Sequence, residues 1–359
     1  MNIEARTQRK SGIELLRIIA ALMVVFSHLT PHFTQSFVTH GSVMGGGNYL
    51  IVNILREISV SAVDIFILIS GFFLWNNNKR TLGKIINLVV LMAIINVSSY
   101  LLQIIIGKNS FEFDVFFRYL CTPNYFVTLY VVLFIISPYI NILLQKMTYK
   151  GWLYFVIIIF LVFSVFNTAA DIINEMTTIN IKGISPIGRE GSQHGYNIVN
   201  FCVLYCLGAF LSAQREKVLK IKTWIAVLIV AVSVAVLYVW SLIGINIQNY
   251  SNSAHNYHNP FIIVMAMCLF VCFDRMEFKS GFINHMAKAA FTTFLLHQHF
   301  FQFLPIDYIV QQSPFFFVLI LMGMFVSIYL VSWVVWWLYN ILSGKFFKWL
   351  DKIEIHYKI

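Results

Sequence analysis

The sequence predicts an all-α membrane protein of about ten transmembrane helices, folded as one domain over residues 1–359. Two observations predict this class. Of the 359 residues, 59% are hydrophobic and only 11% are charged, which is too little charge to cover the surface of a soluble domain of this length. The apolar residues also gather in segments long enough to cross a bilayer as helices, which takes about 20 residues each.

Ten such segments follow one another along the chain. They lie near residues 13–33, 53–75, 85–106, 124–144, 151–168, 198–213, 223–245, 259–274, 287–304 and 314–343. The sixth is short for a span, and the last is long enough to tilt or to continue along the membrane surface. Basic residues precede the first segment, as in a signal peptide, but no small-x-small cleavage pattern follows it. We therefore expect an uncleaved first span.

The distribution of Lys and Arg predicts that both termini are cytoplasmic, because cytoplasmic connections carry an excess of these residues. Most of the 25 Lys and Arg residues occur in the terminal segments and in every second connection. The intervening connections contain only Lys108, Arg118, Lys182 and Arg189. Membrane topology thus accounts for the net charge of +10. The basic residues are dispersed over six segments, which argues against nucleic-acid binding.

The first span carries three polar side chains in an otherwise apolar run: Glu14, Arg17 and His28. Arg17 and His28 are eleven residues apart, so they share one helix face and lie about 16 Å apart along the axis. Glu14 is one turn from Arg17, within reach of an ion pair. A charge at the bilayer centre costs at least about 2.5–3.5 kcal/mol, so such groups face a protein interior or a cavity. We interpret this face as a proton-transfer and anion-binding column inside a membrane enzyme.

Two further spans hold polar residues. Asp64 lies in the second span at nearly the depth of His28, where it would orient or charge-stabilise that histidine if the spans are neighbours. A structural hydrogen bond is the alternative. Ser70 and Gly71 either contact the substrate or form a small-residue packing point. His297, in the ninth span, either lines the site or is a hydrogen-bonded core group.

No residue pattern predicts a metal site. The five cysteines fall mostly in apolar runs and have no His or carboxylate at metal-ligand spacing, so we expect buried thiols. These are Cys121, Cys202, Cys206, Cys268 and Cys272. A site formed by His28, His297 and His299 is conceivable, but no pair of them has the i,i+4 spacing of a helical metal motif.

Three connections on the predicted outer side are rich in Asn, Ser, Gly, Tyr and His: residues 34–52, 169–197 and 246–258. Neutral hydrogen-bonding groups beside aromatic rings suit a sugar. An ordinary solvated loop is the alternative for each of them.

Several segments together resemble the acyltransferase 3 family of integral membrane acyltransferases. The resemblance runs through nearly the whole chain, and the Arg-x10-His pair with the Ser-Gly-Phe segment is its most specific part. The segments are GIELLR-x10-H at 12–28, VDIFILISGFFL at 63–74, YFVTLYVVLFIISPYINILL at 125–144, LYCLGAFL at 204–211 and FTTFLLHQH at 291–299.

The resemblance implies about ten helices and transfer of an acyl group, usually acetyl, from cytoplasmic acyl-CoA to a sugar of an envelope polysaccharide, lipid-linked glycan or antibiotic. It makes Arg17 and His28 the essential pair and places Glu14 where Asp is common. Asp64 and Ser70 match the second-helix motif. One departure is Tyr125 with its two neighbours, where a Trp is expected. We expect a stand-alone membrane domain without a fused SGNH domain.

The sequence therefore predicts a plasma-membrane O-acetyltransferase that uses acetyl-CoA, needs no metal, and modifies a glycan or lipid-linked glycan among membrane lipids. A multi-span transporter or flippase of a lipid-linked sugar is the alternative. His28 would act as general base or as a nucleophile that forms an acyl-imidazole. The predicted catalytic residues are His28, Arg17, Glu14 and Asp64, and the predicted substrate-binding residues are Ser70, Gly71, His297 and Tyr125.

Overall fold

The structure is a computed structural model that describes residues 10–40, 46–177, 179, 181, 183, 193–244, 253–355 and 357. Helices dominate it, and the described residues contain no β-strand beyond an isolated bridge between Thr81 and Glu354. Parts of the three polar outer connections lie outside the described residues. So do five of the basic residues used for the orientation: Arg6, Arg9, Lys182, Arg189 and Lys358.

The helices follow the predicted apolar segments closely. In the first half of the chain they are α1 (Ser11–Thr39), α2 (Gly47–Ser59), α3 (Ala62–Leu74), α4 (Leu82–Ile105), α5 (Phe113–Cys121), α6 (Tyr125–Gln145), α7 (Tyr149–Phe160), the π-helical turn η1 (Leu161–Val165) and α8 (Phe166–Met176). In the second half they are η2 (Gln193–Gly195), α9 (Ile198–Ala213), α10 (Arg215–Val218), α11 (Thr223–Gly244), η3 (Ser253–His255), α12 (Pro260–Asp274), α13 (Gly281–Met286), η4 (Ala287–Ala289), α14 (Ala290–Phe300), η5 (Phe301–Phe303), α15 (Ile306–Val310) and α16 (Pro314–Leu350).

The structure confirms an all-α membrane protein. Within the described chain, eight helical segments are long and apolar enough to cross a membrane: Ser11–Thr39, Gly47–Leu74, Leu82–Ile105, Tyr125–Gln145, Tyr149–Met176, Thr223–Gly244, Ser253–Asp274 and Pro314–Leu350. The other two predicted spans, near 198–213 and 287–304, are also helical but are shorter than these eight segments. α9 has 16 residues, and the segment near 287–304 divides into η4, the 11-residue α14 and η5.

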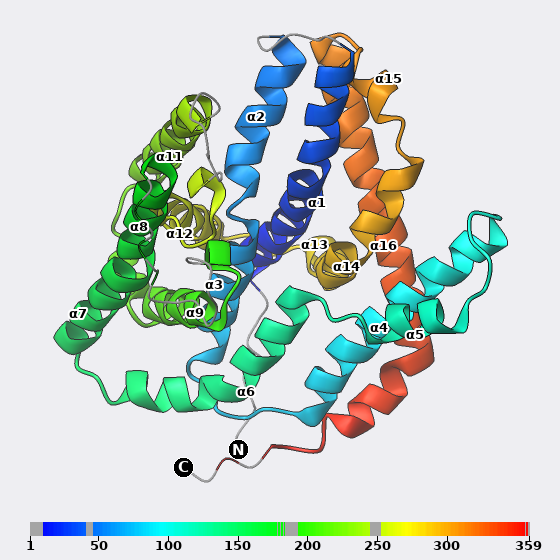
Figure 1. Cartoon of the computed structure of the whole chain (residues 1–359). Helices are drawn as coiled ribbons and strands as arrows, with labels where there is room; N and C mark the ends of the chain where they lie inside the picture. Colours follow the sequence, from blue (N-terminus) through cyan, green and yellow to red (C-terminus); the bar gives the residue numbers. More distant parts are fainter. Residues whose placement is uncertain are drawn as a thin grey trace.

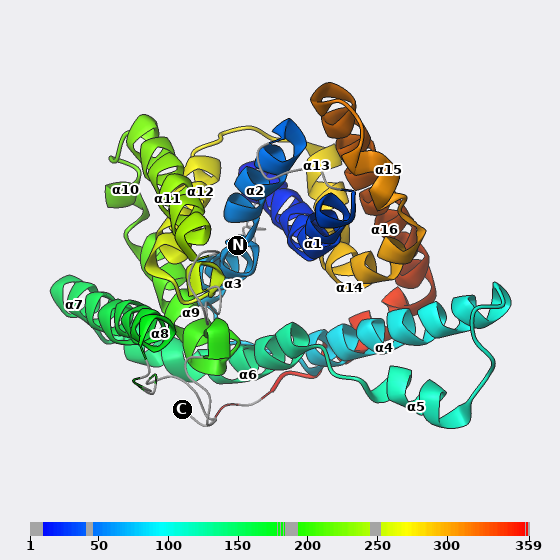
Figure 2. The same ribbon diagram turned by 45° about the horizontal axis from the view of Figure 1, so that its top comes forward.

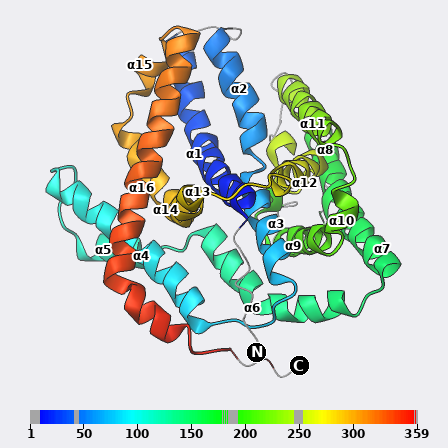
Figure 3. The ribbon, with the colours of Figure 1, turned by 180° about the vertical axis from the view of Figure 1, so that it is seen from behind.

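Helix α1 occupies the centre of the bundle. It packs against α2, α3, α12 and α14. On one side of it lie α7, α8, α9, α11 and α12, and on the other lie α4, α5, α14, α15 and α16 (Figure 1). The view turned by 45° and the view from behind show the same division (Figures 2 and 3). The polar face of α1 is therefore surrounded by protein, as its charges require.

Arg80 joins the α3–α4 connection to α6, although it is 1% exposed. Pro138 lies inside α6 and has no backbone N–H, so the carbonyl of Phe134, four residues earlier, loses its helical partner. The Nε atom of Arg80 donates to that carbonyl oxygen at 3.1 Å and to the Ser137 hydroxyl oxygen at 3.0 Å. Its Nη1 donates to the carbonyl of Asn77 at 2.6 Å. The Ser137 hydroxyl also donates to the Phe134 carbonyl, at 2.9 Å. The two donors thus replace the missing backbone hydrogen bond of α6, and the guanidinium fixes the helix to the connection.

Helices α3 and α9 cross at unusually close range. A Cβ atom on Gly71 would overlap the carbonyl oxygen of Tyr205, and one on Gly208 would overlap that of Leu68. Each helix therefore presents a glycine to the backbone of the other, as small-residue contacts in membranes do. Gly71 is thus a packing residue in this structure.

We expect Gly208→Ala to lower the thermal unfolding midpoint of the detergent-purified protein, because the added methyl group must push α3 away from α9. Overpacking of this kind costs about 1–3 kcal/mol. Gly323→Ala is the matched control, since a Cβ there meets no atom within 4 Å and alanine favours a helix by about 0.5–1 kcal/mol. Equal midpoints for the two variants would contradict the close crossing.

Candidate active site

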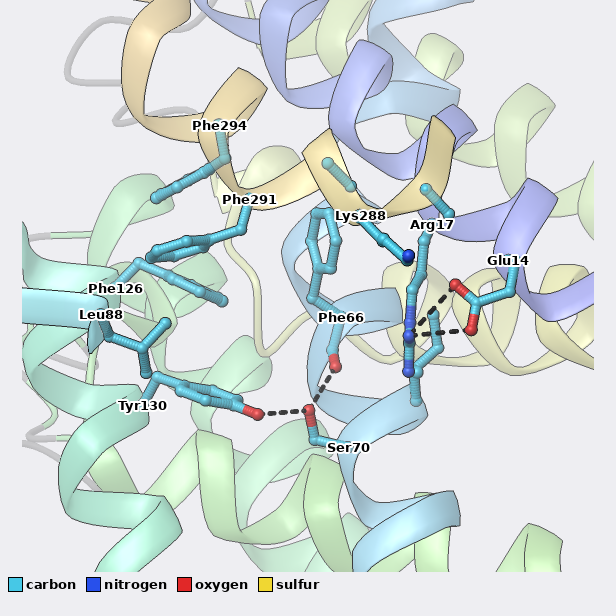
Figure 4. Close-up of a pocket in the computed structure, with 13 residues that line it drawn as sticks. Glu14, Arg17, Phe66, Ser70, Leu88, Phe126, Tyr130, Lys288, Phe291 and Phe294 are labelled. Atoms are coloured by element: carbon cyan, nitrogen blue, oxygen red, sulfur yellow. Dashed lines mark hydrogen bonds and ion pairs between the residues drawn. The ribbon is translucent and has the colours of Figure 1, made fainter. Parts of the chain in front are cut away.

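A cavity of about 310 Å³ opens beside the polar face of α1. Residues of α1, α3, α4, α6, η4 and α14 line it (Figure 4): Glu14, Arg17, Phe66, Ile69, Ser70, Leu88, Phe126, Tyr130, Ala287, Lys288, Ala290, Phe291 and Phe294. Its walls are mostly aromatic and apolar, with a few polar groups that point inward. This composition is typical of small-molecule sites.

The predicted ion pair on α1 forms and faces the cavity. Arg17 Nη1 lies 3.1 and 3.2 Å from the two carboxylate oxygens of Glu14. Glu14 is buried, whereas the Arg17 side chain is 31% exposed. The Nε and Nη2 atoms of Arg17 have no hydrogen-bond partner among the described residues. These N–H groups suit an anionic or carbonyl oxygen in the cavity.

A second cation, Lys288, approaches the same space from η4 (Figure 4). It forms no ion pair within the described part of the chain. With Glu14 and Arg17 it gives the cavity a net positive charge, which favours an anionic ligand. The sequence analysis used Lys288 only as one of the basic residues that indicate the membrane topology. Its position nine residues before His297, similar to the spacing of Arg17 and His28, could have indicated that it lies near the site.

Two hydroxyl groups lie on another part of the wall. Ser70 Oγ is 2.9 Å from the Phe66 carbonyl oxygen and 3.3 Å from the Tyr130 hydroxyl (Figure 4). The structure therefore places Ser70 in the cavity, together with Tyr130, which sequence reasoning missed. Gly71, one residue along α3, points instead into the contact with α9.

Beyond the cavity, the two histidines of α1 and α14 lie together. The ring centroids of His28 and His297 are 4.8 Å apart. His28 Nδ1 lies 2.9 Å from the Val24 carbonyl oxygen, and His297 Nδ1 lies 2.6 Å from that of Phe294. A carbonyl only accepts, so we assign the proton of each ring to Nδ1, which leaves Nε2 as the basic nitrogen. The Nε2 atom of His297 is buried and has no partner among the described residues.

Phe294 connects the histidine pair to the cavity. Its ring lines the cavity, and its centroid lies 6.2 Å from that of His297. Its carbonyl oxygen also accepts from His297 Nδ1. Phe294 therefore lies between the cavity, which neither histidine lines, and the two imidazole rings.

Asp64 and Tyr125 lie outside the cavity. Asp64 is fully buried, and neither carboxylate oxygen has a hydrogen-bond partner among the described residues. No hydrogen bond therefore joins it to His28, whose Nδ1 is bonded to Val24. The ring of Tyr125 packs edge-on against that of Tyr196, with the two ring centroids 4.8 Å apart.

The described residues contain no group of three His, Cys, Asp or Glu side chains placed to hold a metal ion. His299 faces away from the pair: its Nδ1 lies 2.7 Å from the hydroxyl of Ser99. All five cysteines are free, but only Cys206 is buried as expected. Cys121 is exposed, and the remaining three are partly buried: Cys202, Cys268 and Cys272.

The family described as acyltransferase domain matches residues 10–337 of the chain. The match includes Glu14, Arg17, Ser70 and His28 together with the His297 segment. Neither the curated proteins nor the solved structures contain a significant match to this chain. A family match over nearly the whole chain agrees with the resemblance of the motifs, and it accounts for a polar site inside a helical membrane bundle. This chain is a member of the acyltransferase 3 family.

Proposed function

We propose that this membrane acyltransferase is an O-acetyltransferase that moves acetyl from acetyl-CoA to a hydroxyl group of a cell-envelope or exported polysaccharide, or of its lipid-linked precursor. The observation that carries the proposal is a histidine pair beside a cationic cavity. Arg17 and Lys288 line the cavity, and Phe294 of its wall also packs against His297. Nδ1 of His28 and of His297 is hydrogen-bonded to a carbonyl, which leaves Nε2 of each ring as the basic nitrogen.

The position of the cavity supports a cytoplasmic donor in the plasma membrane. Glu14 and Arg17 lie in the first two turns of α1, Ser70 near the end of α3, and Lys288 just before α14. The Lys-rich connections adjoin these helix ends, which the positive-inside rule assigns to the cytoplasm. His28 lies about 16 Å deeper along α1 than Arg17. The donor would enter from the cytoplasm and present its thioester near the middle of the bundle.

In the proposed reaction, His28 Nε2 accepts the proton of the acceptor hydroxyl while the hydroxyl oxygen attacks the thioester carbonyl carbon. The carbon–sulfur bond then breaks, and the CoA thiolate takes the proton back from His28. In the second route, Nε2 of His28 attacks the thioester carbon and expels the CoA thiolate, which leaves an acyl-imidazole. The acceptor hydroxyl then attacks the acyl carbon, the carbon–nitrogen bond breaks to restore His28, and the thiolate takes the hydroxyl proton. Arg17 binds an anionic or carbonyl oxygen of the donor, and Glu14 holds Arg17 in place.

The remaining predicted residues have different supporting roles in this proposal. His297 contacts the acetyl group or the acceptor beside His28, and Ser70 contacts the donor on the cavity wall. Asp64 and Tyr125 would serve the acceptor, since both lie away from the donor cavity. The polar outer connections supply neutral groups of the kind that bind sugars.

We expect His28→Ala to abolish acetyl transfer while the protein still folds and inserts. Mass spectrometry of surface glycans should show the acetyl increment of about 42 Da per modified sugar with the wild type and not with His28→Ala or the deletion strain. His299→Ala is the matched control, because that histidine lies on the same segment as His297 and faces Ser99. Full transfer by His28→Ala would refute the assignment, and identical glycans in all strains would favour the transporter.

Arg17→Gln should raise the KM for acetyl-CoA at least tenfold, because the donor loses a charge-assisted contact. The substitution also leaves the buried Glu14 carboxylate uncompensated, which costs about 3–5 kcal/mol in comparable pairs. The double variant Glu14→Gln/Arg17→Gln separates the two effects. It should recover thermal stability without recovering KM, and steady-state kinetics with unfolding curves would measure both. If the double variant had the wild-type KM for acetyl-CoA, Arg17 would have a packing role and would not bind the donor.

A further inference from the structure

A second cavity of about 320 Å³ adjoins the first. It lies between the start of α4, the start of α14 and the last four turns of α16. The two cavities share three wall residues: Leu88, Lys288 and Phe291. The two cavities are therefore neighbours across these three side chains, and Lys288 faces both of them.

Aromatic and amide groups form much of the wall of this second cavity. Lys288 Nζ lies 5.7 Å from the ring centroid of Trp336, and both residues line the cavity. The Tyr339 hydroxyl donates to the side-chain oxygen of Asn87 at 2.6 Å, which fixes one wall to α4. Base–aromatic stacking and amide hydrogen bonds are how proteins hold a nucleobase.

The same cavity carries two cations. Lys288 faces both cavities and Lys348 lies near the end of α16, and neither forms an ion pair with a described residue. Asp351 is the acidic residue of the lining, and its Oδ1 accepts a hydrogen bond from Thr81 at 2.8 Å. Two unpaired lysines beside an aromatic wall suit the phosphates of a nucleotide.

We propose that this second cavity binds the phosphorylated adenosine half of the acyl-CoA donor, with the pantetheine arm passing Lys288 into the first cavity. The inference rests on the proposed function for the identity of the whole donor. The location of this nucleotide site is independent of the family match. The match ends at residue 337, and Tyr339 and Lys348 lie beyond that residue. The lysines of α16 also place this cavity at the predicted cytoplasmic end of the bundle, where CoA is available.

The direct test measures binding of adenosine 3′,5′-bisphosphate to the purified full-length protein by calorimetry. Lys348→Gln should weaken binding about fivefold through loss of one phosphate contact. Lys345→Gln is the matched control, because Lys345 is an exposed lysine one turn away on the same helix and does not line the cavity. It should leave the Kd unchanged. Absence of binding to the wild type, or equal Kd values for the two variants, would overturn the proposal.

A second measurement uses donors with and without the nucleotide. Lys348→Gln should raise the KM for acetyl-CoA about fivefold and leave the KM for S-acetyl-pantetheine unchanged. An equal change with both donors would overturn the assignment of the nucleotide to this cavity. If the wild type transfers acetyl from neither donor but still binds the bisphosphate through Lys348, the proposed function fails while the nucleotide site stands. If the wild type transfers acetyl normally but does not bind the bisphosphate, the proposed function stands and the nucleotide site fails.

Discussion

The contact of Arg80 with the broken turn of α6 fixes the geometry on which the cavity depends. A bilayer offers no water to a freed carbonyl, so the break at Pro138 would be costly without a buried donor. Arg80 and the Ser137 hydroxyl both donate to that carbonyl, and Arg80 also ties α6 to the connection that follows α3. α6 and α3 carry Tyr130 and Ser70, whose oxygens meet at 3.3 Å in the cavity wall. A buried structural cation thus helps to hold together the two helices whose hydroxyls line the cavity.

Polar side chains near the cavity differ in whether they have a protein partner. Arg80 and the Glu14–Arg17 pair find protein partners, as the low-dielectric interior requires. By contrast, the Nε2 atom of His297 and both oxygens of Asp64 are buried without a hydrogen-bond partner among the described residues. Such groups are costly in an empty protein and are expected where a ligand completes them. The unpaired nitrogen of His297 therefore makes the surroundings of the histidine pair a candidate place for a bound molecule.

Sequence periodicity predicted contacts between residues of one helix, but it missed many contacts between residues of two different helices. The spacing on α1 correctly predicted the Glu14–Arg17 pair, because residues on one helix have fixed relative positions. Ser70 and Gly71 are neighbours in sequence but point about 100° apart, so one lines the cavity and the other packs on α9. Counting residues along the helix axes placed Asp64 at the depth of His28. Such a count does not show in which direction the Asp64 side chain points. Hydropathy likewise predicted the helical segment near 287–304 but not the 3₁₀ turns at its two ends, since it does not report the type of helix.

The short helix α9 has a consequence for the membrane itself. At 1.5 Å per residue, the 16 residues of α9 reach about 24 Å, whereas a typical hydrocarbon core is about 30 Å thick. The 11-residue α14 is continued at its two ends by the 3₁₀ turns η4 and η5, and it packs on α1, whereas α9 packs on α3. A bilayer that adapts to α9 becomes thinner around that helix. Lipid chain length then becomes a determinant of how far apart the aqueous phases lie at the point where donor and acceptor must meet.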